Sequence, residues 1–323
     1  MSQGISSANV EKAAQFGVPV VLIVFRRPDL TSRVLEALAR TRPAKLFVIA
    51  DGPRAGRPKD IEEVRQVREL FENLSWECEV HRIYAESNMG LRERVLSGLD
   101  RVFSEVESAI ILEDDCLPAE DFFLFASQML ERFKNSREVM LVSGNNFAPR
   151  QRLNNTYYFS SHANIWGWAT WARTWSEFRG KDLRTSWYEG EIQQVAKMIP
   201  AKSQRRSFTG LMRSVGQLDS WAISFAAFGY LNRKLSVVPF QNLVTNVGFG
   251  AESTHTKFES FADEVPLGRI SLPLVHPPRI EPNLAEMKRE SRLKSLGWIT
   301  FPILHPIDFL GRVLRYLKLR VSK

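Results

Sequence analysis

Three consecutive carboxylates, Glu113, Asp114 and Asp115, are the residues of this sequence best suited to chemistry. They directly follow the apolar run at residues 109–112, which is typical of a buried strand in a parallel sheet. Adjacent acids repel one another, and a site that keeps them ionised usually supplies a cation. Because carboxylate oxygens suit hard divalent ions, the triplet predicts a Mg²⁺ or Mn²⁺ site. A solvated acidic turn after a strand is the alternative.

The acidic triplet follows three strand–helix repeats, which predict an α/β fold with a parallel sheet. The repeats alternate over residues 17–25, 29–40, 45–50, 60–73, 76–84 and 91–103. We expect Asp29 to cap the first helix. Open α/β sheets bind ligands at the carboxyl ends of their strands. Residues 25–27, Asp51 and Asp115 should therefore meet at one edge and form a nucleotide-sized crevice.

Several classes of protein are excluded by what the sequence lacks. No Gly-x-Gly-x-x-Gly motif follows the first predicted strand, and no P-loop motif occurs, so dinucleotide-binding and P-loop folds are excluded. Its 323 residues are 44% hydrophobic and 25% charged, as in ordinary globular proteins. The two cysteines, Cys78 and Cys116, have no metal-ligand spacing, which fits a reducing compartment. With a polar N-terminus and no long apolar segment, we expect a cytoplasmic protein.

The second half of the chain is less regular and carries most of the tryptophans. Four of them, Trp166, Trp168, Trp171 and Trp175, occur within ten residues. Such a cluster can form part of the core or stack on sugar rings, and both interpretations stay open. The polar residues 180–217 are predicted to be a helical insert. Four prolines between residues 273 and 282 favour an irregular tail over residues 276–306.

The net charge of +8 is concentrated at the C-terminal end. Residues 284–323 contain nine Lys or Arg against three Asp or Glu, and residues 307–323 have the pattern of a basic amphipathic helix. Such a helix can lie on an anionic membrane, which would make the protein peripheral at the inner face, or dock on the protein's own core. Nucleic acid is not an expected partner, because no recognition motif accompanies the charge.

Taken together, the segments 24–28, 50–54, 88–90 and 111–118 resemble nucleotide-sugar glycosyltransferases of the GT-A fold. The likeness is to bacterial family 2-like enzymes, and the chain is also similar to the N-acetylglucosaminyltransferase I group. It continues through 143–146, 167–168 and 246–250, and so spans residues 18–256. The resemblance implies a Rossmann-like, mostly parallel sheet flanked by helices, an acceptor-side α+β part and a C-terminal helical tail. The implied division is an N-terminal tail (1–16), a nucleotide-sugar-binding half (17–150), an acceptor-binding half of the same domain (151–275) and a tail with the basic helix (276–323).

The resemblance also implies which residues bind the donor. It suggests a metal-dependent transfer, with inversion, from a UDP-sugar to a glycan or lipid-linked acceptor. By position Asp51 contacts the uracil, and Phe25 and Arg26 line the base and the diphosphate. Glu113 and Asp114 face the ribose and the sugar. Two further donor-site positions are Asn88 and Trp168, and Trp166 and Trp168 are expected to line the acceptor groove.

The remaining roles are the metal ligands and the base. The resemblance makes Asp115 the direct ligand of Mn²⁺ or Mg²⁺, which would neutralise the leaving diphosphate. His255 is either a second ligand or a loop histidine that bonds the backbone. Relatives carry an acid after the Trp of a late helix, but Ala222 follows Trp221 here. The nearest acid, Asp219, is therefore our predicted base. Two other classes stay open, a sugar nucleotidyltransferase and a non-catalytic carbohydrate- or membrane-binding protein on this scaffold.

Overall fold

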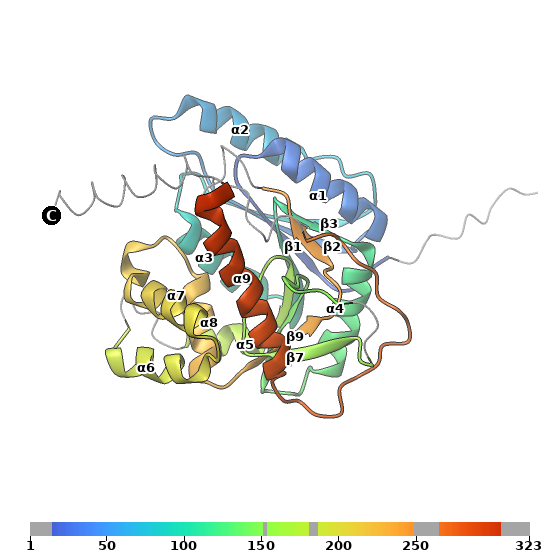
Figure 1. Cartoon of the computed structure of the whole chain (residues 1–323). Helices are drawn as coiled ribbons and strands as arrows, with labels where there is room; N and C mark the ends of the chain where they lie inside the picture. Colours follow the sequence, from blue (N-terminus) through green and yellow to red (C-terminus); the bar gives the residue numbers. More distant parts are fainter. Residues whose placement is uncertain (1–14, 151–153, 181–186, 249–264, 305–323) are drawn as a thin grey trace, which may run out of the picture.

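The computed structural model describes residues 15–150, 154–180, 187–248 and 265–304. Its centre is an eight-stranded sheet in the order β3-β2-β1-β4-β8-β6-β9-β7, with helices on both faces (Figure 1). The strands are β1 (Val20–Val24), β2 (Lys45–Ala50), β3 (Glu79–Tyr84), β4 (Ser108–Glu113), β6 (Val139–Ser143), β7 (Tyr157–Ser160), β8 (Trp168–Trp171) and β9 (Leu235–Pro239). A two-stranded sheet, β5 (Cys116–Pro118) with β10 (Val244–Asn246), lies beside the acidic triplet.

Most neighbouring strands of the large sheet are parallel. β1 pairs in parallel with β2 and β4, β2 with β3, and β6 with β9. β8 is antiparallel to both of its neighbours, and β7 is antiparallel to β9. Of these eight strands six therefore point in one direction and two in the other. The prediction of a mostly parallel α/β sheet is confirmed.

Apart from the edge strand β3, where no residue is fully buried, both faces of the sheet are buried, which explains the continuous apolar runs in the sequence. The helices are α1 (Pro28–Thr41), α2 (Pro58–Glu69), α3 (Leu91–Phe103), α4 (Glu120–Arg132), α5 (Ala172–Arg179), α6 (Glu189–Met198), α7 (Lys202–Arg213), α8 (Ala222–Leu231) and α9 (Leu284–Leu304). Side chains of α1, α2 and α4 share one core with one face of the sheet. Those of α3, α5 and α8 share a second core with the other face. The two layers hold the strand ends, and so the loops that follow them, in fixed positions.

The start of α1 differs from the prediction. The helix begins at Pro28, with Arg27 at the N-cap position, and no side chain caps it. Asp29 lies in the first turn, so its predicted capping role is wrong. The reason is that proline needs no hydrogen-bond acceptor for a backbone N–H and has the helical φ already fixed, so it is favoured in the first turn.

The predicted irregular tail is also wrong from residue 284 on, where α9 begins. The run of prolines ends at Pro282, and Asn283 then opens the helix. The Asn283 side chain accepts the backbone N–H of Glu286 at 3.2 Å, and its carbonyl accepts that of Met287 at 3.0 Å. The prolines thus mark the approach to a helix. The basic helix expected at residues 307–323 lies outside the described residues.

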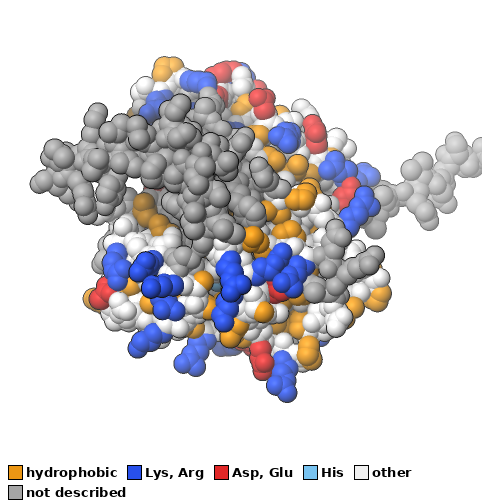
Figure 2. Space-filling model, in the orientation of Figure 1, with side chains coloured by type: hydrophobic (Ala, Val, Ile, Leu, Met, Phe, Trp, Pro, Cys, Tyr) orange, Lys and Arg blue, Asp and Glu red, His pale blue; other side chains and the backbone are white. Residues whose placement is uncertain are grey.

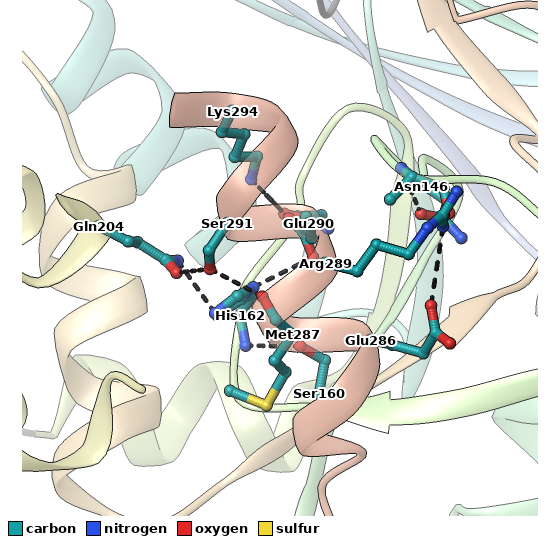
Figure 3. A network of polar contacts seen from close by, with 12 residues as sticks. Asn146, Ser160, His162, Gln204, Glu286, Met287, Arg289, Glu290, Ser291 and Lys294 are labelled. Atoms are coloured by element: carbon teal, nitrogen blue, oxygen red, sulfur yellow. Dashed lines mark hydrogen bonds and ion pairs between the residues drawn. The ribbon is translucent and has the colours of Figure 1, made fainter. Parts of the chain in front are cut away.

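A buried polar network fixes α9 to the rest of the protein (Figure 3). The carboxylate of Glu290, which is fully buried, lies 3.1 Å from Nδ1 of His162 and 2.6 Å from Nζ of Lys294. His162 Nε2 contacts the side-chain amide of Gln204 on α7 at 3.0 Å, and that amide accepts the hydroxyl of Ser291. Burial raises the pKa of Glu290, but Lys294 and His162 outweigh it and hold the pKa well below its usual range. α9 is therefore joined to α7 and to the loop after β7.

The outer side of α7 and α9 carries a group of exposed basic side chains. Figure 2 shows several Lys and Arg side chains on the face that carries these helices. Four exposed ones are Lys202 and Arg206 on α7 and Lys288 and Arg292 on α9. None of the helices in the described ranges combines the length and the apolar character that a membrane span requires.

Candidate active site

A cavity of about 330 Å³ lies at the carboxyl ends of β1, β2 and β4. That volume is within the range of small-molecule sites, and the location is where open α/β sheets bind ligands. The cavity brings together most of the predicted residues, which are Phe25, Arg26, Asp51, Asn88, Glu113, Asp114, Asp115 and Asp219. It is also lined by Arg27, Arg54, Arg94, Trp166, Asn246 and Gly248. His255 lies outside the described residues.

Asp51, at the end of β2, holds the loop that leads into α3. One carboxylate oxygen accepts the backbone N–H groups of Gly52 and Met89, both at 2.9 Å. The other accepts the N–H of Gly90 at 3.2 Å and the side-chain amide of Asn88 at 2.8 Å. Because a carboxylate has about four acceptor positions, these bonds use most of its capacity. The predicted contacts of Asp51 and Asn88 with a nucleotide stay predictions.

Asp219, the predicted base, lies at the cavity and caps α3 from a distant part of the chain. Its two carboxylate oxygens accept the backbone N–H groups of Leu91 and Arg92, each at 2.8 Å. The first N–H groups of a helix have no partner within the helix, and a carboxylate there also suits the helix dipole. Gly90, with φ of +82°, leaves the space for this carboxylate, since a Cβ there would lie 2.9 Å from it. The structure thus gives Asp219 a structural role as well as a place in the cavity.

Two guanidinium groups lie close to the ring of Phe25, which lines the cavity. The Cζ atoms of Arg26 and Arg54 lie 5.6 and 5.7 Å from the ring centroid, which suits cation–π contacts. Asp60, at the start of α2, holds both cations, and its Oδ1 is 3.1 Å from Arg26 Nη1 and 2.9 Å from Arg54 Nη2. The hydrogen bond from Arg54 lowers the pKa of Asp60 to about 2, so this carboxylate stays ionised.

The acidic triplet is largely buried, and Arg27 lies against it. Asp114 and Asp115 are only 3% and 8% exposed, and Glu113 is half-buried. Nη2 of Arg27 forms ion pairs with Oδ1 of Asp114 and, at 2.9 Å, with Oδ2 of Asp115. Burial lowers the pKa of Arg27, but these two acids outweigh it and raise it above its usual value.

The protonation of the triplet follows from burial and from mutual repulsion. Burial and then the charges of Asp115 and Asp114 raise the pKa of Glu113 to about 8, with Arg27 acting in the opposite direction. Burial also raises the pKa of Asp114, to about 6, because the pairing with Arg27 offsets only part of it. At neutral pH and without a further cation, Glu113 therefore retains its proton.

Arg94, on the first turn of α3, is a cation that the sequence analysis missed. Its side chain is 6% exposed, and its Nε has no hydrogen-bond partner among the described residues. Its Nη1 lies 3.6 Å from the sulfur of Met89. Burial lowers the pKa of Arg94, and Asp51 acts in the opposite direction. A buried cation that forms no ion pair with the described residues is costly, so Arg94 is a candidate ligand-binding residue of the cavity. In the sequence, the signal that could have indicated Arg94 was its position four residues after Gly90.

The tryptophans divide between the cavity and the core. Trp166 lines the cavity and packs edge-on against Phe147, with ring centroids 4.9 Å apart. Trp168 is 1% exposed and stacks on Trp221 at 5.5 Å within the core beneath α8. The prediction that Trp168 contacts a ligand is therefore wrong. Since Trp168 belongs to β8, its side chain points to the face that α8 covers, whereas Trp166 precedes the strand.

The described carboxylates, as arranged, do not fit a divalent ion. Within the described ranges no group of three or more His, Cys, Asp or Glu side chains could hold a metal. Asp115, the predicted ligand, is paired with Arg27. Its Oδ2 is also crowded by the backbone of Gly248, where a Cβ would lie 2.3 Å away. The cation next to these carboxylates is thus a guanidinium.

Comparison with known proteins identifies no family. No family model and no curated protein matches the chain. Among solved structures it is similar to a mannose-1-phosphate geranyltransferase from Thermus thermophilus, with 14% identity and a TM-score of 0.37 over 70% of this chain and 74% of that one. A putative glucose-1-phosphate thymidylyltransferase from Bacillus anthracis, in complex with a sucrose, has 12% identity and a TM-score of 0.37 over 71% and 89%. HddC from Yersinia pseudotuberculosis, complexed with GMP-PN, has 10% identity and a TM-score of 0.31 over 48% and 77%. These likenesses are too distant to assign an activity.

Proposed function

We propose that this protein is a GT-A-type glycosyltransferase that transfers a sugar, with inversion, from a UDP-sugar to a glycan or lipid-linked acceptor. The observation that carries the proposal is the composition of the cavity at the strand ends. Asp51, the acidic triplet and Asp219 line it together with four arginines. Acids suit the hydroxyl groups and base of a nucleotide sugar, and arginines suit its diphosphate.

Each group then has a role in the transfer. Arg27 and Arg94 supply positive charge where the diphosphate leaves, which stabilises the charge that develops as the glycosidic bond breaks. Trp166 offers a flat aromatic surface against which the acceptor can stack. Asp219 removes the proton of the acceptor hydroxyl as that oxygen attacks the anomeric carbon. Asp115, the ligand that the resemblance implies for Mn²⁺ or Mg²⁺, is paired with Arg27 at 2.9 Å, so no step is assigned to a metal.

The test is donor hydrolysis, because without an acceptor many transferases slowly transfer the sugar to water and release the nucleotide. UDP release would be measured for the wild type over a panel of UDP-sugars, with Mn²⁺ and with EDTA. Arg94→Gln should weaken UDP binding by about tenfold or more, since a charged hydrogen bond is lost. Arg33→Gln, at an exposed position on α1, is the matched control and should bind as the wild type does.

Two results would replace the proposal with one of its alternatives. Release of pyrophosphate from UTP and a sugar 1-phosphate, with no UDP released from any donor, would identify a nucleotidyltransferase. No turnover of either kind would leave a binding protein on this scaffold. The second alternative draws support from Asp219, whose two oxygens already accept hydrogen bonds from α3.

A further inference from the structure

Arg27 is held at the carboxylate pair of Asp114 and Asp115 from two directions. It precedes Pro28, the first residue of α1, so the proline that starts the helix also fixes where the arginine lies. Its backbone carbonyl accepts the N–H of Thr31 at 2.9 Å and the hydroxyl of the same residue at 2.8 Å. The guanidinium is therefore presented to the acids by the end of β1 and by the first turn of α1.

Backbone hydrogen bonds also fix the positions of Asp114 and Asp115. The backbone N–H of Asp114 donates to Ile23 at 3.0 Å, which aligns the end of β4 with β1. The carbonyl of Asp115 accepts the N–H of Val247 at 2.8 Å, beside the β5–β10 pair. Gly248, which also lines the cavity, lies close against the pair, because a Cβ there would lie 2.6 Å from Asp115 Cβ and 2.7 Å from Arg27 Nη1. Among the described residues, the cation in contact with these two carboxylates is therefore the guanidinium of Arg27.

The guanidinium retains donors for a ligand. Both contacts with the carboxylates come from Nη2, whereas an arginine has five N–H donors in a planar fork. The Arg27 side chain is 22% exposed and lines the cavity. Its geometry suits the planar, bidentate recognition of phosphate oxygens.

We propose that Arg27 takes the place of a divalent cation in this site. The guanidinium neutralises Asp114 and Asp115 and at the same time donates to the diphosphate of the nucleotide, so nucleotide binding needs no metal. The proposal rests on the proposed function only for the identity of the ligand, a nucleoside diphosphate. That Arg27 occupies the carboxylates in place of an ion can be tested without any nucleotide.

The first experiment measures Mn²⁺ binding to the nucleotide-free protein by electron paramagnetic resonance. The variants are Arg27→Gln, which removes the charge, Arg27→Lys, which keeps it, and Arg33→Gln on the same helix as the control. Arg27→Gln should bind Mn²⁺ about tenfold or more tightly than the wild type, because it exposes two carboxylates to the ion. Arg27→Lys and Arg33→Gln should stay close to the wild type. Circular dichroism confirms that each variant is folded.

The second experiment measures UDP binding by calorimetry in EDTA and in Mn²⁺. The wild type should bind UDP with the same affinity in both, and Arg27→Gln should lose about tenfold or more in EDTA. The proposal is overturned if the wild type binds Mn²⁺ as tightly as Arg27→Gln does, or if EDTA abolishes UDP binding by the wild type. If the wild type binds no nucleotide under either condition, the proposed function fails, and the Mn²⁺ measurement still decides the role of Arg27.

Discussion

Asp219 caps α3 at Leu91, although 128 residues separate the two in the sequence. The bond joins the loop before α8 to α3, and so connects the late part of the chain to the side of the cavity that Asp51 lines. Asp219 was predicted as a base from its nearness to Trp221. The structure adds that the same carboxylate fixes the position of α3. Substitution of Asp219 therefore has two separable effects.

Asp219→Ala should lower the free energy of unfolding by about 0.5–2 kcal/mol, the usual range for losing a helix-capping side chain. Asp219→Asn should retain one acceptor oxygen and lose less stability. If Asp219 is the base, the asparagine variant should still bind UDP but release it from a donor at least about a hundredfold more slowly. Thermal unfolding and donor hydrolysis measured on both variants separate the two roles. Unchanged hydrolysis in Asp219→Asn would leave only the structural role.

The raised pKa of Glu113 predicts a pH dependence of stability in metal-free buffer. In the unfolded chain a glutamate has a pKa of about 4.3. In the folded protein the pKa is about 8, so the folded state holds a proton that the unfolded state has lost between these values. The contribution of this proton to the free energy of unfolding should therefore be complete below the lower pKa, and it should be lost as the pH rises through about 8.

The measurement is the Tm of the wild type and of Glu113→Gln in EDTA between about pH 6.5 and 8.5, a range that brackets the raised pKa. Above this lower limit the contribution of Asp114, whose pKa is about 6, is largely complete. The wild type should lose more stability than Glu113→Gln across this range. Equal slopes would show that Glu113 is not protonated in the folded protein. Glu36→Gln, at an exposed position on α1, should follow the wild-type curve.

The network around Glu290 predicts that Glu290→Gln destabilises the protein at neutral pH. The buried amide would leave His162 and Lys294 with a weaker acceptor, at a cost of about 1–3 kcal/mol. Because the pKa of Glu290 is lowered on folding, its contribution is present above about 4.3 and is lost as the pH falls through the folded value. The difference between the variant and the wild type should therefore shrink in acid.

Urea unfolding at about pH 7 and at about pH 3.5, on either side of the unfolded-state value, measures this difference. Glu281→Gln is the control, because that side chain is 67% exposed and lies just before α9. A difference that stays constant between the two pH values would mean that Glu290 stabilises α9 through packing alone and that its charge has no part in it.

Gly248→Ala should displace the pair of Arg27 and Asp115. The added Cβ would come within 2.6 Å of Asp115 Cβ, which is close to the backbone and cannot move without it. We expect UDP binding to weaken by about tenfold or more, because at least one charged contact is lost. Gly210→Ala on α7, where nothing lies within 4 Å of the added atom, is the control in calorimetry. Wild-type UDP affinity in Gly248→Ala would show that the pair tolerates a shift.

Strands and their ends were the part of the molecule that the sequence predicted best. Residues 45–50 and 91–103 form β2 and α3 with the predicted bounds, since apolar runs and helical spacing carry local information. The meeting of Asp51 with Asp115 at one edge followed from the parallel topology.

What sequence reasoning missed depends on contacts between distant residues. Arg27 was expected at the same edge as Asp115, but only the fold shows its guanidinium in contact with two acids. Arg94 occurs in an ordinary context, and only the fold shows it buried with no ion pair among the described residues. Trp168 and Trp166 are two positions apart, yet their environments differ because one belongs to β8 and the other does not. The helix α9 was obscured by prolines that end just before it.

The segment around residue 282 determines when the edge of β7 becomes covered during synthesis of the protein. β7 is an edge strand of the sheet, and its free edge is partly covered by the bridge between Phe159 and Pro282 and by the N–H of Asn283, which donates to Phe159 at 2.8 Å. During translation this edge is therefore open until the residues that begin α9 have left the ribosome. An uncovered strand edge is a template for pairing with other chains. A nascent or prematurely terminated chain that lacks residues 282–283 would expose it, so this segment should protect the newly made protein from aggregation.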